Sequence, residues 1–510
     1  MIVLDLVARA EQSEAPVVTD LPFEVALGVR RSALKAGRDI GGRLIRAGVQ
    51  TILFAPSRMR VERLLTLLRD GLRGKPGDPE RIAGYRGGYL PLERRRIERG
   101  LRDGSVRGVV ATNALELGID IGGLGASVVV GYPGSRASLW QQFGRAGRGE
   151  EVALSVLIGT SNPLDQYVLA NPEFVFEQPA EHGLIDPDNL YVLASHLKCA
   201  AFELPFADGE AFGAHTEEFL ALLVEEGVLQ HARGRYYWMT ESYPAEQVSL
   251  RTASTNNVVI IEQGPEPRVV GEVDRASAPL LVHEQAIYIH AGQQYQVEHL
   301  DWENAKAYIT PVSVDYYTDA HLAVDLKVLE GFEQVAAPAA LHEVGEVAVT
   351  SLATIFKKVR METGENVGWG KIALPEESLH TSAYWLAFEE AATVGLRRDE
   401  LAAGLAGIAH LGRNLAPIFC LCDPRDIEAA TQVRSPYNLR PTVFLYDHAP
   451  GGTGLSERIF EIRDDLIAAC AELVATCPCS NGCPSCVGPQ IEPRSPAKAA
   501  AATLLERVSA

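Results

Sequence analysis

The sequence predicts an α/β protein in which a parallel-sheet domain is followed by smaller modules and by a mixed α/β domain with a cysteine cluster. Three observations support this prediction. Strand-like apolar runs alternate with helical runs through the first 160 residues, which is typical of a parallel sheet covered on both faces. Residues 250–315 then change to β-branched and aromatic runs separated by turns. Four cysteines lie within residues 477–486.

The first domain opens with a helical pattern over residues 25–47, in which apolar residues recur among basic ones. After residue 47, short apolar runs alternate with runs whose apolar residues recur at helical spacing. Ligands of parallel α/β sheets bind outside the carboxyl ends of the strands, so we expect functional side chains just after these strands. The expected strands are residues 51–55, 81–84, 108–112, 127–131 and 152–158, and the expected helices between them are residues 58–69 and 92–101.

The remainder of the chain divides into three further parts. Prolines punctuate residues 163–187, which predicts a connector. Two helical patterns then precede a strand, a basic turn and a strand at residues 227–239, which predicts a winged-helix-like module. Residues 250–315 predict a small β-barrel or sheet, and the run VAAPAA at 335–340 predicts a local loop. The expected units are the parallel-sheet domain 1–165, the connector and winged-helix-like module 166–245, the small β-rich module 246–335 and the C-terminal mixed α/β domain 340–510.

The formal net charge of −19 is unevenly distributed. Residues 1–150 contain 24 Lys and Arg against 16 Asp and Glu, whereas the remainder contains 23 against 50. A basic first domain is compatible with phosphate contacts. The acidic remainder either argues against a large nucleic-acid surface or simply keeps the protein soluble. No run of eighteen apolar residues and no basic leader are present, which predicts a cytoplasmic protein without a membrane partner.

Two segments of the first domain carry the strongest functional signal. Residues 111–120 read ATNALELGID, and residues 141–148 read QQFGRAGR. Arg145 and Arg148 are three residues apart, so both face the same side of one helical turn. The small residues around them let a phosphate approach closely. These segments resemble motifs V and VI of superfamily 2 helicases, which lie on the second of two RecA-like domains.

The resemblance implies roles at a nucleotide site for five residues. Arg145 and Arg148 match the paired arginines of motif VI, and Gln141 begins that motif. An arginine delivered to a transferring phosphate is worth on the order of 10³–10⁵ in rate, so these three are the predicted catalytic residues. Gly118 and Asp120 belong to motif V, whose aspartate commonly meets the nucleotide ribose. They are the predicted nucleotide-binding residues.

The other half of a nucleotide site is missing from the sequence. A phosphate loop reads G-x-x-x-x-G-K-[ST], but neither Gly-Lys pair, at 74–75 or 370–371, is followed by Ser or Thr. The single adjacent Asp-Glu pair, at 399–400, does not follow an apolar strand. We therefore expect ATP and Mg²⁺ to bind only together with a first RecA-like half, and we expect the isolated chain to be inactive.

Another group of residues is predicted to contact DNA. Residues 51–63 look like motif IV, in which a helix start can hold a backbone phosphate, and the glycine pair in YRGGYLPLERRR would let the chain approach DNA closely. For the charges at 93–96 we favour a solvated helix face. Motif V supplies two positions near the nucleic-acid backbone, and the winged-helix-like hairpin supplies a basic turn. The predicted contacts are Ser57, Arg58, Gly87, Gly88, Thr112, Asn113 and Arg235.

The cysteine cluster predicts a metal site. Cys477, Cys479, Cys483 and Cys486 lie in the run CPCSNGCPSC, and four thiolates suit tetrahedral Zn²⁺. Such clustering without a secretion signal favours metal over disulfides, with an iron–sulfur cluster as the alternative. The site is expected to be structural. The other four cysteines are expected to be core thiols, although those within residues 420–422 could form a second half-site.

A glycine-rich segment precedes the cluster. Residues 445–457 read LYDHAPGGTGLSE. Such a turn could be catalytic, could bind phosphate or could be structural, and we favour the structural interpretation because Asp, His and glycines alone are weak evidence.

The combined motifs resemble the bacterial mitomycin repair factor A family, which is close to the fungal RecQ-four-like helicases. The resemblance runs from residue 22 to residue 490. It implies an ATP-dependent 3′-to-5′ DNA helicase or translocase in DNA repair, with single-stranded or 3′-tailed DNA and an N-terminal RecA-like half as partners. The alternative is a non-catalytic, zinc-containing DNA-binding subunit that docks on a separate ATPase chain.

Overall fold

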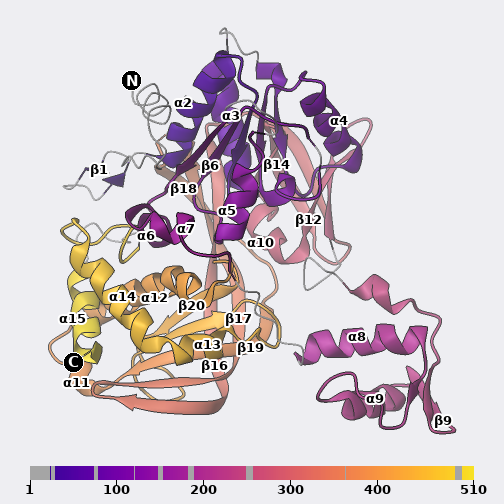
Figure 1. The fold of residues 1–510 in the computed structure, drawn as a ribbon, viewed down its shortest axis with the longest axis vertical. Helices are drawn as coiled ribbons and strands as arrows, with labels where there is room; N and C mark the ends of the chain where they lie inside the picture. The colour runs from indigo at the N-terminus through magenta and orange to yellow at the C-terminus, as the bar shows by residue number, and fades with distance from the viewer. Residues whose placement is uncertain are drawn as a thin grey trace.

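The structure is a computed structural model of the 510-residue chain (Figure 1). It describes residues 23–24, 29–30, 32–73, 79–119, 121–147, 153–181, 189–248, 257–361, 363–488 and 497–509. None of the helices in these ranges is both long and apolar enough to cross a membrane.

The first domain contains a parallel sheet with the strand order β4-β5-β3-β6-β7. Its strands are β3 (Thr51–Phe54), β4 (Ile82–Tyr85), β5 (Gly108–Ala111), β6 (Ala126–Val130) and β7 (Leu154–Ile158). Every residue of β3, β5 and β6 is buried. Burial on both faces explains why these strands read as continuous apolar runs rather than as alternating ones.

Helices cover both faces of this sheet, as the sequence predicts. The helices α2 (Ala33–Arg46) and α3 (Arg58–Leu72) share one apolar cluster with the strands. On the other face, α4 (Pro91–Arg102) and α5 (Arg136–Phe143) join a second cluster. The expected helix 25–47 begins only at residue 33, because the side chain of Ser32 caps its first turn and β1 (Phe23–Glu24) pairs with β2 (Val29–Arg30) before it.

A short connector leads to the winged-helix module. It contains α6 (Pro163–Ala170) and α7 (Glu173–Phe176). The module itself comprises α8 (Leu190–Glu203), α9 (Thr216–Glu225) and a small sheet of β8 (Phe206–Ala207), β9 (Leu229–Ala232) and β10 (Arg235–Trp238). The turn between β9 and β10 has positive φ at both Arg233 and Gly234, which suits a two-residue hairpin. Figure 1 shows the module to one side of the rest of the molecule.

The small β module is one five-stranded sheet with the order β12-β11-β15-β14-β13. Its strands are β11 (Asn257–Glu262), β12 (Arg268–Asp274), β13 (Ile287–His290), β14 (Gln293–Asp301) and β15 (Lys306–Val312), with the short helix α10 (Ala278–Leu281) before β13.

A long antiparallel hairpin then runs into the C-terminal domain. It pairs β16 (Tyr316–Ala337) with β17 (Ala340–Arg360) along almost their whole length. The expected loop at 335–340 is therefore reduced to a two-residue turn at 338–339, because Ala337 already pairs with Ala340. The hairpin also crosses the boundary that the sequence places at 335–340.

The C-terminal domain packs helices against a sheet with the order β16-β17-β19-β21-β20. Its further strands are β18 (Asn366–Lys371), β19 (Glu377–Phe388), β20 (Ile427–Gln432) and β21 (Thr442–Asp447), and its helices are α11 (Glu390–Thr393), α12 (Arg398–Cys420), α13 (Leu455–Glu461), α14 (Arg463–Thr476) and α15 (Ala497–Ser509). The helices α12 and α15 approach closely where α12 has glycine. A Cβ atom at Gly404 would lie 3.0 Å from the Cβ of Ala500.

Candidate functional site

The motif V segment leaves the sheet at the carboxyl end of β5. Thr112 is nearly buried, and its hydroxyl accepts a hydrogen bond from the N–H of Ala114, which begins a short 3₁₀ turn over Asn113–Leu115. Asn113 is exposed. Gly118 has φ +76°, and a Cβ atom there would meet nothing within 4 Å, so backbone conformation and not space requires glycine. Asp120 lies outside the described residues.

Arg145 of motif VI is bound to the motif V segment. Its Nη1 donates to the carbonyl oxygen of Ile119 at 2.6 Å, and its Nε donates to the carbonyl oxygen of Glu116 at 3.0 Å. The side chain is 6% exposed. In this arrangement the guanidinium links the two motifs, while its predicted contact with nucleotide stays a prediction. Arg148 lies outside the described residues.

A second link between the motifs escaped the sequence analysis. The carboxylate of Glu116 accepts hydrogen bonds from the hydroxyl of Ser138 at 2.6 Å and from Nε2 of Gln142 at 2.9 Å. Gln142 is 3% exposed, whereas Gln141, the predicted residue, is exposed to solvent. Ser138 and Gln142 are four residues apart on α5 and hence on one face. That spacing, together with a glutamate between two leucines of motif V, was the available signal.

Several predicted DNA-binding residues share one edge of the sheet. Ser57 follows β3, and Thr112 and Asn113 follow β5, which is hydrogen-bonded to β3 in parallel. Ser57 is exposed, and its hydroxyl caps α3 by accepting from the N–H of Arg60 at 3.3 Å. The structure thus places these three residues together, as expected for the carboxyl ends of neighbouring parallel strands.

Arg58 and Gly88 have a different environment from the one that the sequence suggested. Nη1 of Arg58 lies 3.0 Å from a carboxylate oxygen of Asp274 at the end of β12. The carbonyl of Gly88 accepts from the N–H of Glu272, and a Cβ atom at Gly88 would lie 2.5 Å from the carbonyl oxygen of Glu272. The space beside Gly88 is therefore filled by β12 and is not open to DNA. The neighbouring Gly87 is half-buried.

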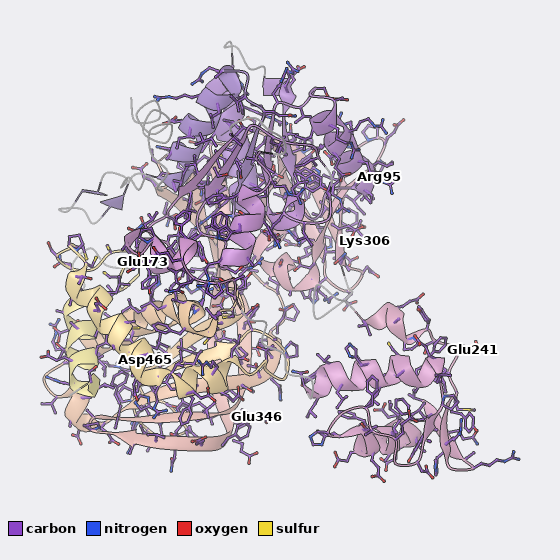
Figure 2. All side chains as sticks on the ribbon, in the orientation of Figure 1. Arg95, Glu173, Glu241, Lys306, Glu346 and Asp465 are labelled. Carbon is purple, nitrogen blue, oxygen red and sulfur yellow. The ribbon has the colours of Figure 1, made fainter. Side chains whose placement is uncertain are left out.

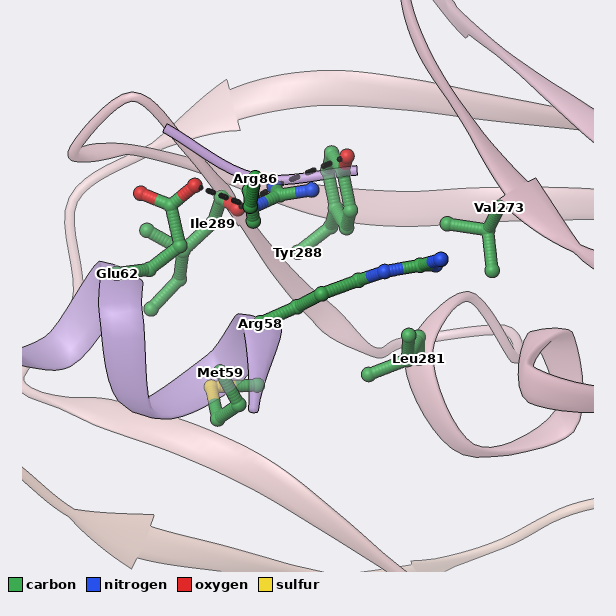
Figure 3. A pocket seen from close by; sticks show the side chains of 8 residues that line it. All are labelled: Arg58, Met59, Glu62, Arg86, Val273, Leu281, Tyr288 and Ile289. Atoms are coloured by element: carbon green, nitrogen blue, oxygen red, sulfur yellow. Dashed lines mark hydrogen bonds and ion pairs between the residues drawn. The ribbon is translucent and has the colours of Figure 1, made fainter. Parts of the chain in front are cut away.

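A buried ion pair forms the centre of this contact between the first domain and the small β module (Figure 3). Nε of Arg86 lies 2.7 Å from Oε1 of Glu62, and both side chains are 2% exposed. Desolvation by burial opposes the charge of Arg86, but Tyr288, Glu62 and Tyr89 outweigh it and raise its pKa. Nη2 of Arg86 also donates to the carbonyl oxygen of Ile289 at 2.9 Å. The pair therefore anchors β13 to the first domain.

The charges on α4 are divided between solvent and this contact. Arg95 is exposed and points away from the body (Figure 2), and Arg96 is exposed too. Glu93 faces the small β module, where one carboxylate oxygen lies 3.4 Å from Nε2 of His290. The favoured solvated face thus describes Arg95 and Arg96, but not Glu93 or the half-buried Arg94.

The winged-helix hairpin carries Arg235 on its exposed side. The aromatic residues beside it differ in their environment. Trp238 packs edge-on against Phe202 with ring centroids 5.9 Å apart, and Tyr236 packs on His231 at 4.5 Å. Tyr237 is 38% exposed. Within this group, Arg235 and Tyr237 remain accessible to a ligand.

The four clustered cysteines have the geometry of a metal site. Their Sγ atoms lie within 4.8 Å of one another, and neighbouring pairs are 3.5 to 3.8 Å apart. Tetrahedral zinc with Zn–S bonds of about 2.3 Å requires sulfur–sulfur distances of about 3.8 Å, so the cluster fits Zn²⁺. Lys498 fixes the loop by donating to the carbonyl oxygens of Cys477 at 2.6 Å and Cys479 at 2.7 Å.

The remaining cysteines form no such site. Across the described part of the chain, the quartet is the one group of three or more potential ligand residues that could hold a metal ion. Burial raises the pKa of Cys420 and of Cys470 to about 12. These thiols are therefore protonated at neutral pH, as expected of core residues.

A parallel-sheet domain with linked motifs V and VI, followed by a winged helix and a four-cysteine domain, defines the C-terminal region of a helicase. Three known families match it in that order: the helicase conserved C-terminal domain at residues 38–150, the winged helix domain of the ATP-dependent helicase HRQ1 at 185–253, and the MrfA Zn-binding domain at 408–487.

Individual proteins are similar over most of the chain. The uncharacterized ATP-dependent helicase YprA of Bacillus subtilis is 48% identical over 91% of this chain and 62% of its own length. The ATP-dependent helicase hrq1 of Schizosaccharomyces pombe is 30% identical over 90% of this chain and 45% of its own length. The crystal structure of the DUF1998 helicase MrfA bound to DNA superimposes with a TM-score of 0.72 at 46% identity, covering 96% of this chain and 65% of that one.

The chain is thus similar in sequence and structure to the helicases MrfA, YprA and hrq1, and it corresponds to the C-terminal portion of these proteins. It spans less than two thirds of the length of these relatives. The predicted resemblance and the predicted fold class are confirmed.

Proposed function

We propose that this chain is the C-terminal part of an ATP-dependent 3′-to-5′ DNA helicase or translocase that acts in DNA repair. One observation carries the proposal: motifs V and VI are joined at the carboxyl edge of the parallel sheet by Arg145 and Glu116. In a helicase, motif VI meets the nucleotide and motif V meets both nucleotide and DNA. With a rigid link between the two motifs, a change in nucleotide binding at motif VI can alter the contact of motif V with DNA.

In this proposal the nucleotide is bound between two domains. A first RecA-like half holds the phosphates and Mg²⁺, and this chain brings Arg148 to the transferring phosphate while Asp120 and Gly118 lie near the nucleotide. Arg145 positions the motif VI segment through the carbonyl oxygens of Glu116 and Ile119. The chain by itself turns over no ATP.

DNA contacts are proposed on two surfaces of the chain. The sheet edge would hold the phosphate backbone of one DNA strand through Ser57, Thr112 and Asn113, in keeping with the DNA-bound crystal structure of the homologue MrfA. Arg235 on the winged-helix hairpin would add a phosphate contact. Zn²⁺ would be held by the cysteine quartet as a structural ion.

The test is reconstitution of the chain with a first RecA-like half, in cis or in trans. DNA-stimulated ATP hydrolysis should appear, and Arg148→Ala should lower it on the order of 10³-fold while DNA binding persists. Arg95→Ala, on the exposed face of α4, is the matched control and should leave the rate unchanged. Robust hydrolysis by the isolated chain, or full activity of Arg148→Ala, would contradict the proposal. DNA binding without any stimulated hydrolysis would favour a docking subunit instead.

A further inference from the structure

The glycine-rich turn at residues 449–454 is built by a buried carboxylate. Asp447 ends β21 and is fully buried. Its carboxylate accepts hydrogen bonds from the N–H groups of Thr453 at 2.6 Å, Leu455 at 3.2 Å and Ser456 at 2.9 Å. The residue before α13, Gly454, has no side chain with which to cap the helix, so Asp447 supplies the cap from the preceding strand. The conformation of the turn is therefore set by hydrogen bonds within the C-terminal domain.

The same turn is also fastened to β19. The hydroxyl of Thr381 donates to the carbonyl oxygen of Ala449 at 2.9 Å, and the N–H of Gly451 donates to that of His380 at 2.9 Å. Both Gly451 and Gly452 have positive φ, and a Cβ atom at Gly452 would lie 2.5 Å from Oγ of Ser382. Glycine is needed here for conformation and for space.

One side chain of the winged-helix module donates hydrogen bonds to two carbonyl groups of this turn. Nδ2 of Asn189 donates to the carbonyl oxygen of Pro450 at 3.1 Å and to that of Gly452 at 2.6 Å. Its Oδ1 accepts from the N–H groups of Tyr191 and Val192, both at 3.1 Å, and so caps α8. Asn189 is 7% exposed.

The contact is small. The first turn of α8 remains largely in solvent, since Leu190, Tyr191 and Val192 are 45–54% exposed. Gly451 lies against the Tyr191 ring, because a Cβ atom there would be 2.8 Å from Cδ2 of Tyr191. Between described residues, the hydrogen bonds that join the module to the rest of the chain are both donated by Asn189. Figure 1 shows α8 approaching the C-terminal domain by its first residues.

The contact between α6 and α12 also uses the asparagine that caps a helix, but there it is accompanied by apolar packing. We call this contact the α6 joint and the contact made by Asn189 the α8 joint. Asn162 caps α6 and donates from Nδ2 to Oδ1 of Asn414 on α12 at 2.7 Å. There, however, Leu164 of α6 lies in one buried cluster with Leu411 and Leu415 of α12. The α6 joint is held mainly by apolar packing, whereas the α8 joint depends on its hydrogen bonds.

We propose that the turn at residues 449–454 is a docking surface for the winged-helix module, with Asn189 as the residue that holds the module in place. The glycine-rich motif thus serves to present two carbonyl oxygens to an asparagine amide. Breaking this contact should free the module to swing on its connecting segments while it stays folded.

The substitution Asn189→Asp separates the two tasks of the side chain. Aspartate caps a helix as well as asparagine does, but it cannot donate to the two carbonyl oxygens. Small-angle X-ray scattering of the full chain should show a larger maximum dimension, because losing both hydrogen bonds shifts the docked state on the order of tenfold or more toward the released state. Hydrogen exchange in α8 should stay slow, which shows that the module leaves its dock folded.

The matched control is Asn162→Asp, which should leave the scattering curve unchanged because packing holds that joint. If α8 of Asn189→Asp loses its exchange protection, Tyr191→Ala decides instead. That variant keeps the cap and removes the ring beside Gly451, and it should also enlarge the maximum dimension. Scattering curves of folded Asn189→Asp or Tyr191→Ala that match the unsubstituted chain would overturn the proposal. The proposed helicase activity would be unaffected by that outcome.

Discussion

The substitution Glu62→Gln should detach the small β module from the first domain. Glu62 and Arg86 form an ion pair in which both side chains are 2% exposed. The same carboxylate accepts from the hydroxyl of Tyr89 at 2.8 Å and from the N–H of Gly292 at 3.1 Å. Glutamine has nearly the same volume but no charge, so Arg86 would be left buried without a counter-charge.

Removing one partner of a buried, hydrogen-bonded ion pair costs about 3–5 kcal/mol. Exposed pairs are worth only about 0–1 kcal/mol. The pair between Arg397 and Asp399 is such a case, because both side chains are more than two-thirds exposed. Asp399→Asn is therefore the control, and its effect should be small.

Hydrogen exchange resolves the effect locally in a chain with several domains. A loss of about 3 kcal/mol corresponds to exchange on the order of 10²-fold faster, and we expect it in β13, whose Ile289 carbonyl accepts from Arg86. Exchange in the zinc-binding domain should stay the same. Equal exchange of β13 in Glu62→Gln and in the unsubstituted chain would refute the reasoning, because the pair would then contribute nothing to the attachment.

Three further predictions concern the metal, DNA and pH. Elemental analysis should find one zinc per chain, and Cys483→Ser should destabilise the C-terminal domain by several kcal/mol because metal binding and folding are coupled; iron, or no metal, would contradict this. In a salt titration of single-stranded DNA binding, Arg235→Ala should reduce the slope of log affinity against log salt concentration by about one. Arg58→Ala should change this slope less, because Asp274 already pairs with Arg58. If the curves of both variants match that of the unsubstituted chain, the DNA surface lies elsewhere. Burial, with a smaller contribution from Arg463, lowers the pKa of His342 from 6.5 to about 4. Because the unfolded chain then binds a proton that the folded chain does not, the free energy of unfolding should fall by about 1.4 kcal/mol per pH unit between pH 6.5 and pH 4. His342→Gln should remove this slope from the free energies of unfolding measured in urea.

The residue period and the local motifs were sufficient to predict much of this protein. Continuous apolar runs predicted the buried parallel strands, because a strand covered on both faces has no polar side. The spacing of Cys477, Cys479, Cys483 and Cys486 predicted the metal site, because one turn-rich loop brings all four thiols together. Motifs V and VI were readable for the same reason, since each is a short continuous segment.

Tertiary structure decided what those segments touch. Arg145 faces the carbonyl oxygens of Glu116 and Ile119, and Gly88 faces the backbone of Glu272. Asn189 reaches a turn 261 residues away along the chain. Local propensity carries no information about partners at such separations, because they are chosen by how whole elements pack. The sequence by itself therefore determined the parallel-sheet elements, the winged-helix module and the cysteine cluster, and the fold determined the long hairpin and which polar groups hold the domains together.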